Sequence, residues 1–278
     1  MQLININALS ATESDGVLVL FRDGSNLTLA RFSPNFSEKN ELVTITGTKG
    51  HILLAKDDAI LFSVDDTLIL FKGGKHRIVL KAHRPENVFW HTCEFREAVL
   101  VQEYGLSPAS IYSSEDLSCW KEIVSNLDID PKSKHFHDLV YDSYRNQLIA
   151  TLGDGNYVRA ISSSNHGLEW HTLFEGPWQF LPVVPLRDKI VFGMDSSLVK
   201  GGIGIYDLPS RTWKFVFLKW VDANVKLAQI CDLKRLETGL WIAALGTPQA
   251  IVLSENLESW YPLYVEGFDN AFNHYMSV

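Results

Sequence analysis

The chain has 278 residues, of which 46% are hydrophobic and 21% are charged, and its formal net charge is −8 at pH 7. This composition is that of an ordinary globular protein, and the length suits one large β-domain or two smaller domains. The acidic balance, with no cluster of Lys and Arg, excludes nucleic acid as an expected partner, because a phosphate backbone needs a basic surface.

Three features bear on the compartment. The first residues have neither a basic segment nor a long apolar run, so no signal peptide is expected. The longest uncharged stretch, Thr238 to Ser254, is broken by Gly246-Thr247-Pro248-Gln249 and is interpreted as two strands instead of a membrane span. The three cysteines are scattered, without the spacing of metal ligands, and suit a reducing compartment. We therefore expect a cytoplasmic protein with no membrane partner.

Short alternating segments run through the whole chain, separated by clusters of Gly, Asn, Asp and Ser. This is the pattern of antiparallel strands joined by tight turns. The stretch of residues 136–174 shows the pattern as a group of four strands, FHDLVYD, QLIATL, YVRAISS and WHTLF. No window keeps a 3.6-residue period, so no long helix is predicted. The six predicted four-stranded groups span residues 3–46, 51–81, 88–124, 136–174, 180–218 and 226–265.

A tryptophan follows the third turn in each of the last four groups. Trp120, Trp170, Trp213 and Trp260 are spaced by 50, 43 and 47 residues, which is the length of one propeller blade. The sequence therefore predicts an all-β fold, a six-bladed β-propeller of four-stranded antiparallel blades, as a single domain over residues 1–278. We expect the tryptophans to be largely buried between blades, and the C-terminal segment FNHYMSV to dock beside the N-terminal strands and close the ring.

The turn Ser163-x-Asn165-x-Gly167-x-x-Trp170 resembles the Asp-box of sialidase-like (BNR-repeat) β-propellers. The segments QEYGLSPASIYSSEDLSCW, KHFHDLVYDSYRNQLIATLGDGN and IVFGMDSS also resemble uncharacterised members of that group that are labelled glycosyl hydrolases. The resemblance implies that Ser and Asn bond the turn backbone, that Gly takes the left-handed position, and that Trp packs between blades. The Phe-Arg-Ile-Pro signature of true sialidases is absent, so the resemblance does not extend to sialic-acid hydrolysis.

Propeller topology predicts where a functional site lies. The turns between second and third strands share one face with the connections between blades, and their polar residues should surround the axis. Carboxylates and imidazoles there could move protons, and aromatic faces could stack on sugars. The candidate catalytic residues are Glu103, Tyr104, His135, His137, Asp154 and Asp195. The candidate substrate-binding residues are Arg84, Asn87, Trp178, Gln179, Asn224, Lys226 and His274.

Each candidate has a structural alternative. An Asp in a tight turn, such as Asp154, often serves only the turn. The pair His135-x-His137 shares one face of a strand, where an imidazole is either a proton carrier or a hydrogen-bonded structural group. Glu103 and His137 are expected on one rim, as an acid/base pair. No cofactor is expected, although four histidines on inner strands could converge on an axial metal: His51, His91, His137 and His274.

Two classes of function fit these residues. The first is a carbohydrate-active enzyme acting on an acidic glycan. As a glycosidase it would use two carboxylates, Glu103 with Asp154 or Asp195. As a lyase it would use His137 or Tyr104 as the base, with Arg84 or Lys134 neutralising a uronate. The alternative is a non-catalytic propeller that binds a glycan or another protein. A catalytic carboxylate pair should have its two pKa values pushed apart, whereas a binding face should not.

Overall fold

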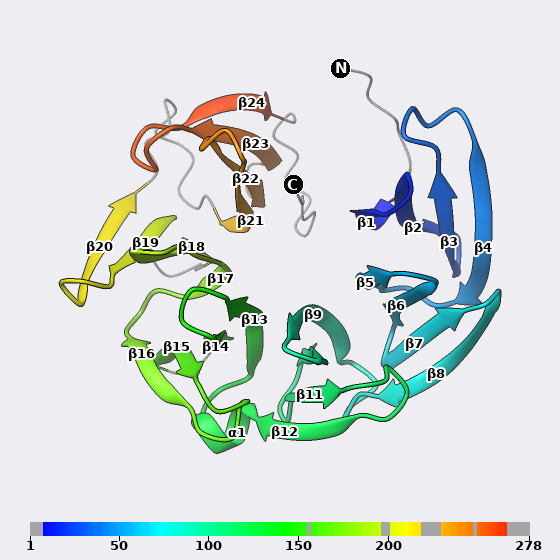
Figure 1. Ribbon diagram of the computed structural model, residues 1–278, viewed down its shortest axis with the longest axis horizontal. Helices are drawn as coiled ribbons and strands as arrows, with labels where there is room; N and C mark the ends of the chain where they lie inside the picture. Colours follow the sequence, from blue (N-terminus) through cyan, green and yellow to red (C-terminus); the bar gives the residue numbers. More distant parts are fainter. Residues whose placement is uncertain (1–7, 155–156, 196–200, 218–228, 247–248, 266–278) are drawn as a thin grey trace. The chain divides into compact units, whose positions relative to one another are not determined.

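The computed structural model describes residues 8–154, 157–195, 201–217, 229–246 and 249–265 (Figure 1). Its strands form six sheets, each with four antiparallel strands in chain order. The fold class is therefore a six-bladed β-propeller, and the sequence prediction is confirmed. The chain divides into two compact units of three blades each, Met1–Asp128 and Ile129–Val278, and the single-domain organisation stays a prediction.

The first unit contains blades one to three. Blade one consists of β1 (Ala8–Glu13), β2 (Val17–Asp23), β3 (Asn26–Phe32) and β4 (Lys39–Thr46). Blade two consists of β5 (Ile52–Lys56), β6 (Ala59–Val64), β7 (Thr67–Lys72) and β8 (Lys75–Lys81). Blade three consists of β9 (Val88–Phe95), β10 (Ala98–Tyr104), β11 (Ser110–Ser114) and β12 (Lys121–Ser125). Helix α1 (Asn126–Ile129) follows β12.

The second unit contains blades four to six. Blade four consists of β13 (His135–Asp142), β14 (Gln147–Gly153), β15 (Val158–Ser163) and β16 (His171–Glu175). Blade five consists of β17 (Phe180–Pro185), β18 (Lys189–Met194), β19 (Gly202–Asp207) and β20 (Thr212–Phe217). Blade six consists of β21 (Ile230–Arg235), β22 (Trp241–Gly246), β23 (Gln249–Ser254) and β24 (Tyr261–Val265). The segment FNHYMSV, predicted to close the ring, lies outside the described residues.

The core of each unit lies between successive blades. In the first unit, Leu18 and Leu20 of β2 pack in one cluster with Ile60 and Phe62 of β6. Burial follows from this stacking, because a middle strand is covered on both faces by its neighbours. All six residues of β6 are buried, so its two faces cannot be told apart by polarity. The outer strand β8 is mostly exposed, as expected for the edge of a blade.

The tryptophans that mark the blades take part in this packing. Trp120, Trp213 and Trp260 each pack against a cluster shared by two successive blades of one unit. Trp213 is the centre of an aromatic group, with ring centroids 4.7 Å from Phe174 and 5.1 Å from Phe192. All four are partly buried, and none lies in the fully buried core. The prediction of interblade packing is therefore confirmed for three tryptophans, with less burial than expected.

The turns before these tryptophans are held by side-chain hydrogen bonds. In blade four, the Ser163 hydroxyl accepts from Gly167 N at 3.0 Å, and Asn165 Oδ1 accepts from Glu169 N at 2.9 Å. In blade six, Ser254 Oγ accepts from Leu257 N at 2.9 Å. These bonds satisfy turn amides that no strand could pair, so the turns have a folding role.

Blade one contains a turn of the same kind that the tryptophan pattern did not reveal. Asn35 Oδ1 accepts from Ser37 N at 3.2 Å, and Ser33 Oγ accepts from Glu38 N at 3.0 Å. Phe36 occupies the left-handed position with a φ of 59°. No tryptophan follows this turn, which is why the repeat was not visible in the first blade.

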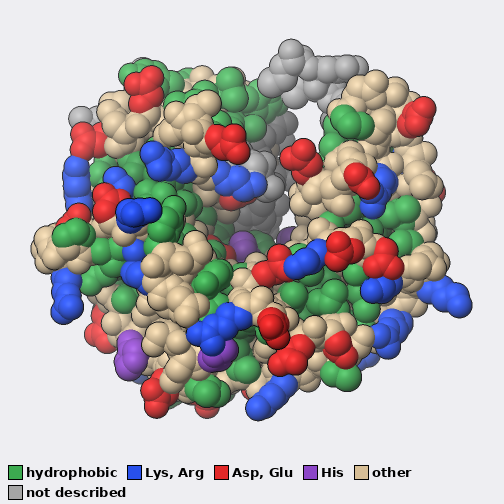
Figure 2. Space-filling view, in the orientation of Figure 1, with side chains coloured by type: hydrophobic (Ala, Val, Ile, Leu, Met, Phe, Trp, Pro, Cys, Tyr) green, Lys and Arg blue, Asp and Glu red, His purple; other side chains and the backbone are tan. Residues whose placement is uncertain are grey.

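Acidic and basic side chains are interspersed over the surface seen in Figure 2. Within the described ranges, no helix has the length and apolar character that crossing a membrane requires.

Candidate functional site

Five of the predicted site residues meet at one end of blades four and five. His135 and His137 begin β13, and Asp154 follows the end of β14. His135 pairs with Gly153 in the ladder, so these three residues lie at the same end of blade four. Gln179 precedes β17, and Asp195 follows β18. Phe180 pairs with Met194, so Gln179 and Asp195 lie at the same end of blade five. We call these residues and Lys134 the Asp154 cluster. The cluster lies wholly within the second unit.

Hydrogen bonds join the two blades at this cluster. Gln179 Nε2 donates to Asp154 Oδ1 at 2.9 Å, and the N–H of Asp195 donates to the main-chain oxygen of Gln179 at 2.8 Å. Lys134 Nζ lies 3.3 Å from the other oxygen of Asp154. The side chains of Lys134 and Asp154 are 48% and 45% exposed, so a ligand in solution can reach them.

The two histidines near Asp154 are buried. His135 and His137 are 2% and 3% exposed, and their rings are stacked with centroids 5.1 Å apart. His137 Nδ1 lies 3.1 Å from the main-chain oxygen of Phe180. A carbonyl only accepts, so Nδ1 carries the hydrogen of this bond. A Cβ on Gly153 would lie 1.8 Å from His137 Nε2, so only glycine permits this position of the ring.

The two carboxylates of the cluster have opposite pKa shifts. Burial raises the pKa of Asp195 to about 6, and the negative charge of Asp154 contributes to the rise. Burial also acts to raise the pKa of Asp154. The hydrogen bond from Gln179, the charges of His135 and His137, and the hydrogen bond from Lys134 outweigh it, so the pKa of Asp154 is lowered. At mildly acidic pH one carboxyl therefore holds a proton while its neighbour is ionised.

The remaining predicted residues of the second unit are not part of this cluster. Trp178 is partly buried, with its ring centroid 4.0 Å from that of Phe215, and it packs against the core of blades four and five. It therefore serves blade packing instead of a sugar platform. Asn224, Lys226 and His274 lie outside the described residues.

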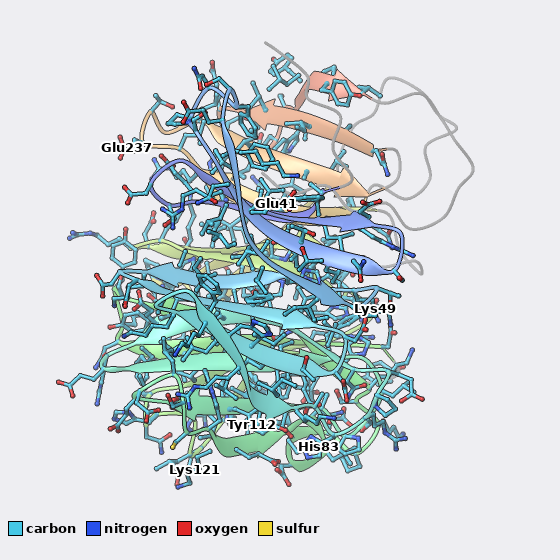
Figure 3. All side chains as sticks on the ribbon, turned by 90° about the vertical axis from the view of Figure 1, so that its right-hand side faces the viewer. Glu41, Lys49, His83, Tyr112, Lys121 and Glu237 are labelled. Carbon is cyan, nitrogen blue, oxygen red and sulfur yellow. The ribbon has the colours of Figure 1, made fainter. Side chains whose placement is uncertain are left out.

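Glu103 is the centre of a second polar group, in the first unit. Figure 3 labels two of its partners, His83 and Tyr112. The Glu103 side chain is fully buried, and Oε1 accepts from His83 N at 2.6 Å. Oε2 lies 2.7 Å from His83 Nδ1 and accepts from Ser110 N at 3.0 Å and from the Tyr112 hydroxyl at 3.1 Å. Burial and the charge of Glu103 raise the pKa of Tyr112, so Tyr112 stays a hydrogen-bond donor.

The other candidates of the first unit support loops and packing. Asn87 Nδ2 donates to Leu106 O at 2.9 Å, and Arg84 Nε donates to Ser107 O at 2.7 Å. The Tyr104 ring meets Trp90 edge to face, with centroids 4.0 Å apart. Glu103 and His137 belong to different units, so their acid/base pairing stays a prediction.

His83 is a titratable residue in contact with Glu103 that the sequence pattern did not indicate. It lies in the connection between β8 and β9, directly before Arg84, which was named from the same loop set. Only the fold shows that its ring reaches Glu103, 20 residues away.

Four histidines on inner strands are the candidate ligands of an axial metal, although no cofactor is expected. His51 stacks on Trp90 at 5.4 Å, and burial followed by the charge of His91 lowers the pKa of His51 to about 4. The part of the chain that the structure describes contains no group of three potential metal ligands.

Comparisons with known proteins identify the fold and not a family. No protein family matches the chain, and no curated protein matches it. A GH74 enzyme from Niastella koreensis superimposes with a TM-score of 0.66 at 12% identity, over 92% of this chain and 46% of that one. The GH74 xyloglucanase from Xanthomonas campestris gives 0.69 at 9% identity, over 93% and 45%.

A third similar structure is an oligogalacturonate lyase in complex with manganese. Its TM-score is 0.59 at 9% identity, over 95% of this chain and 85% of that one. At such identities the likeness shows the propeller fold alone. The chain spans less than half the length of the two GH74 proteins.

Proposed function

We propose that the protein is a carbohydrate-active enzyme of the glycosidase type, acting on an acidic glycan at the Asp154 cluster. The observation that carries the proposal is the pair of neighbouring carboxyls with opposite pKa shifts, Asp154 lowered and Asp195 raised to about 6. Glycoside hydrolysis needs one carboxylic acid and one carboxylate at the same bond, which this difference supplies.

Asp195 is assigned as the general acid. Its proton passes to the glycosidic oxygen as the bond from that oxygen to the anomeric carbon breaks. Asp154, ionised and half exposed, stabilises the positive charge that develops at the anomeric carbon and accepts a proton from the water that attacks this carbon. Proton donor and carboxylate thus have separate roles, set by their surroundings.

The other members of the cluster position these two groups. Gln179 fixes one oxygen of Asp154, and the buried rings of His135 and His137 act on the reaction through Asp154. Lys134 and the buried Arg159 supply positive charge near Asp154, which suits the carboxylate of a uronate. Similar structures named as a xyloglucanase and an oligogalacturonate lyase are in keeping with this class, since the same fold serves carbohydrate chemistry there.

The test is a cleavage screen on acidic and neutral oligosaccharides, with the products analysed for a new reducing end. We expect Asp154→Asn and Asp195→Asn each to lower kcat by roughly a hundredfold or more while both proteins stay folded. Glu237→Gln, in an exposed turn, is the matched control and should keep full activity. Activity should fall as pH rises above the pKa of Asp195, about 6, because the acid then loses its proton.

Other outcomes would contradict the proposal in distinct ways. Unsaturated products would indicate elimination, and the lyase reading with His137 as base would replace hydrolysis. Binding of a glycan without turnover of any oligosaccharide would favour the non-catalytic propeller.

A further inference from the structure

A cavity of about 430 Å³ lies at the opposite end of the strand ladders from the Asp154 cluster. It is formed by turns of blades four, five and six, all within the second unit. Asp142 pairs with Gln147, and Pro185 pairs with Ile190, at the ends of the ladders remote from His135 and Phe180. The side chains that matter for its chemistry are Arg187, Asp188, Lys189, Arg235, Trp241 and Glu255.

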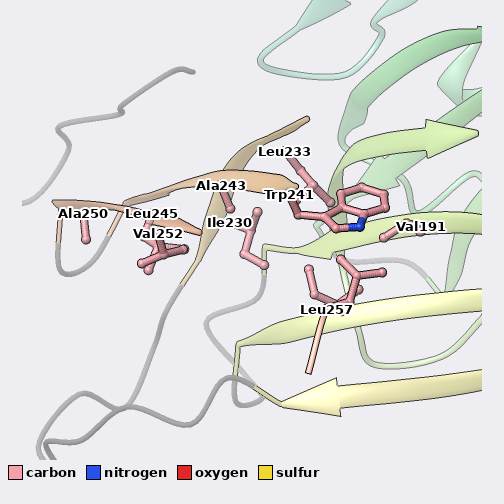
Figure 4. Close-up of a cluster of buried hydrophobic side chains, with 10 residues drawn as sticks. Val191, Ile230, Leu233, Trp241, Ala243, Leu245, Ala250, Val252 and Leu257 are labelled. Atoms are coloured by element: carbon pink, nitrogen blue, oxygen red, sulfur yellow. The ribbon is translucent and has the colours of Figure 1, made fainter. Parts of the chain in front are cut away.

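The base of the cavity is part of the core of blades five and six. Trp241 and Leu257 line it and are 4% and 2% exposed, and both belong to the apolar cluster that contains Val191 (Figure 4). A base held by the core cannot collapse into the opening, so the shape persists without a ligand.

The wall from blade five is fixed by blade four. The Arg145 guanidinium donates to Leu186 O at 3.0 Å and to Arg187 O at 3.1 Å, and it forms an ion pair with the buried Asp142. The N–H of Leu186 also donates to Lys189 O at 2.8 Å. These bonds hold the backbone that presents Arg187 and Lys189, so this turn does not have to be ordered on binding.

Three cations face this cavity in a chain whose net charge is −8. Among the residues that the structure describes, Arg187 and Arg235 form no ion pair with a carboxylate. Lys189 lies opposite Asp207 in the ladder, and its charge contributes to lowering the pKa of that carboxylate. Asp188, Glu255 and Asn256 line the same space and accept hydrogen bonds. A ligand that satisfies both sets needs an oxyanion for the cations and hydroxyls for the acceptors.

We propose that this cavity binds an anionic sugar, whose carboxylate or phosphate is held by Arg187, Lys189 and Arg235. The volume lies within the range of small-molecule sites, and Arg is suited to bidentate contacts with planar oxyanions. The sugar hydroxyls donate to Asp188 and Glu255, and the ring lies over Trp241. The proposal is independent of the reaction assigned to the Asp154 cluster, because the two sites lie at opposite ends of the same blades.

Titration calorimetry on the full chain tests it, with glucuronate, glucose 6-phosphate and glucose as the probes. We expect one of the two anions to bind at least tenfold more tightly than glucose, and the better one identifies carboxylate or phosphate. Arg235→Gln should weaken that binding at least tenfold, and Lys189→Gln is a second variant should Arg235→Gln fail to fold. Lys121→Gln, which removes an exposed cation of the first unit, is the matched control and should leave the affinity unchanged.

Three results would overturn the proposal. These are equal affinity for glucose and both anions, no measurable binding of either anion, and unchanged binding in the two cavity variants. Loss of binding in Asp154→Asn alone would place the sugar at the Asp154 cluster, which would support the proposed function and reject this second site.

Discussion

The carboxylate of Glu103 lies 2.7 Å from Nδ1 of His83, and its other oxygen accepts the main-chain N–H of the same residue at 2.6 Å. This double contact ties the connection between blades two and three to the end of β10. Ser110 N and the Tyr112 hydroxyl complete the bonding of the buried group. A residue that the sequence marks as catalytic is therefore also the structural centre of its loop region.

Glu103→Gln should destabilise the first unit. Both carboxylate oxygens of Glu103 accept hydrogen bonds, and in glutamine one of them is replaced by an NH₂ group that cannot accept. The free energy of unfolding should therefore fall by about 2–4 kcal/mol. Urea unfolding monitored by tryptophan fluorescence measures the change. Glu97→Gln is the control, because Glu97 is exposed in the turn between β9 and β10. An unfolding energy equal to that of the wild type would show that the buried bonds are dispensable.

Asp195→Asn should make the protein more stable at neutral pH. The pKa of Asp195 in the folded state is about 6, above its ordinary value of 3.8, so folding favours the protonated carboxyl. Its stabilising contribution is complete below the ordinary pKa and is lost as pH rises through about 6. The substitution should therefore add about 3 kcal/mol at pH 7 and less than about 1 kcal/mol near pH 4. Unfolding curves across this range decide it, and an equal gain at both pH values would contradict it.

Gly153→Ala should displace His137 without changing any charge. The new Cβ would overlap the imidazole at Nε2, and overpacking of this kind costs about 1–3 kcal/mol. We expect weaker stability together with a changed His137 signal in NMR spectra. Gly24→Ala is the comparison for backbone strain alone. Nothing lies within 4 Å of its Cβ position, but its φ of 59° disfavours alanine, so it should lose stability with no change in the His137 signal. An unchanged His137 signal would show that the ring has room that the structure does not provide.

Trp213→Ala should cost more than Trp170→Ala. Trp213 contacts five aromatic rings across blades four and five, among them Phe180 at a centroid distance of 5.7 Å. We expect a loss of about 3–5 kcal/mol for Trp213→Ala. Trp170 is in an exposed turn, and its indole donates to Gly167 O at 2.9 Å, so a smaller loss is expected. Thermal unfolding of both variants gives the order, and the reverse order would contradict the packing described here.

The sequence by itself determined the strands and the turns of this protein. Alternation of apolar residues and the turn residues act over a few positions, so strands such as β7 and β10 could be located to within about a residue. The grouping of His135, His137, Asp154 and Asp195 also followed from topology, because neighbouring strands of one blade end together and successive blades lie side by side. Such information is local or is fixed by the order of the strands.

Only the tertiary structure decided what each side chain does. Trp178 has the flat aromatic ring that a sugar could stack on, but it packs against the core of blades four and five. His83 stands out by no sequence pattern, but its ring contacts a buried carboxylate. Asp154 and Asp195 have the same chemistry in the sequence and opposite pKa shifts in the fold. The physical reason is that burial and charge at an atom are set by neighbours far along the chain, and no local pattern records them.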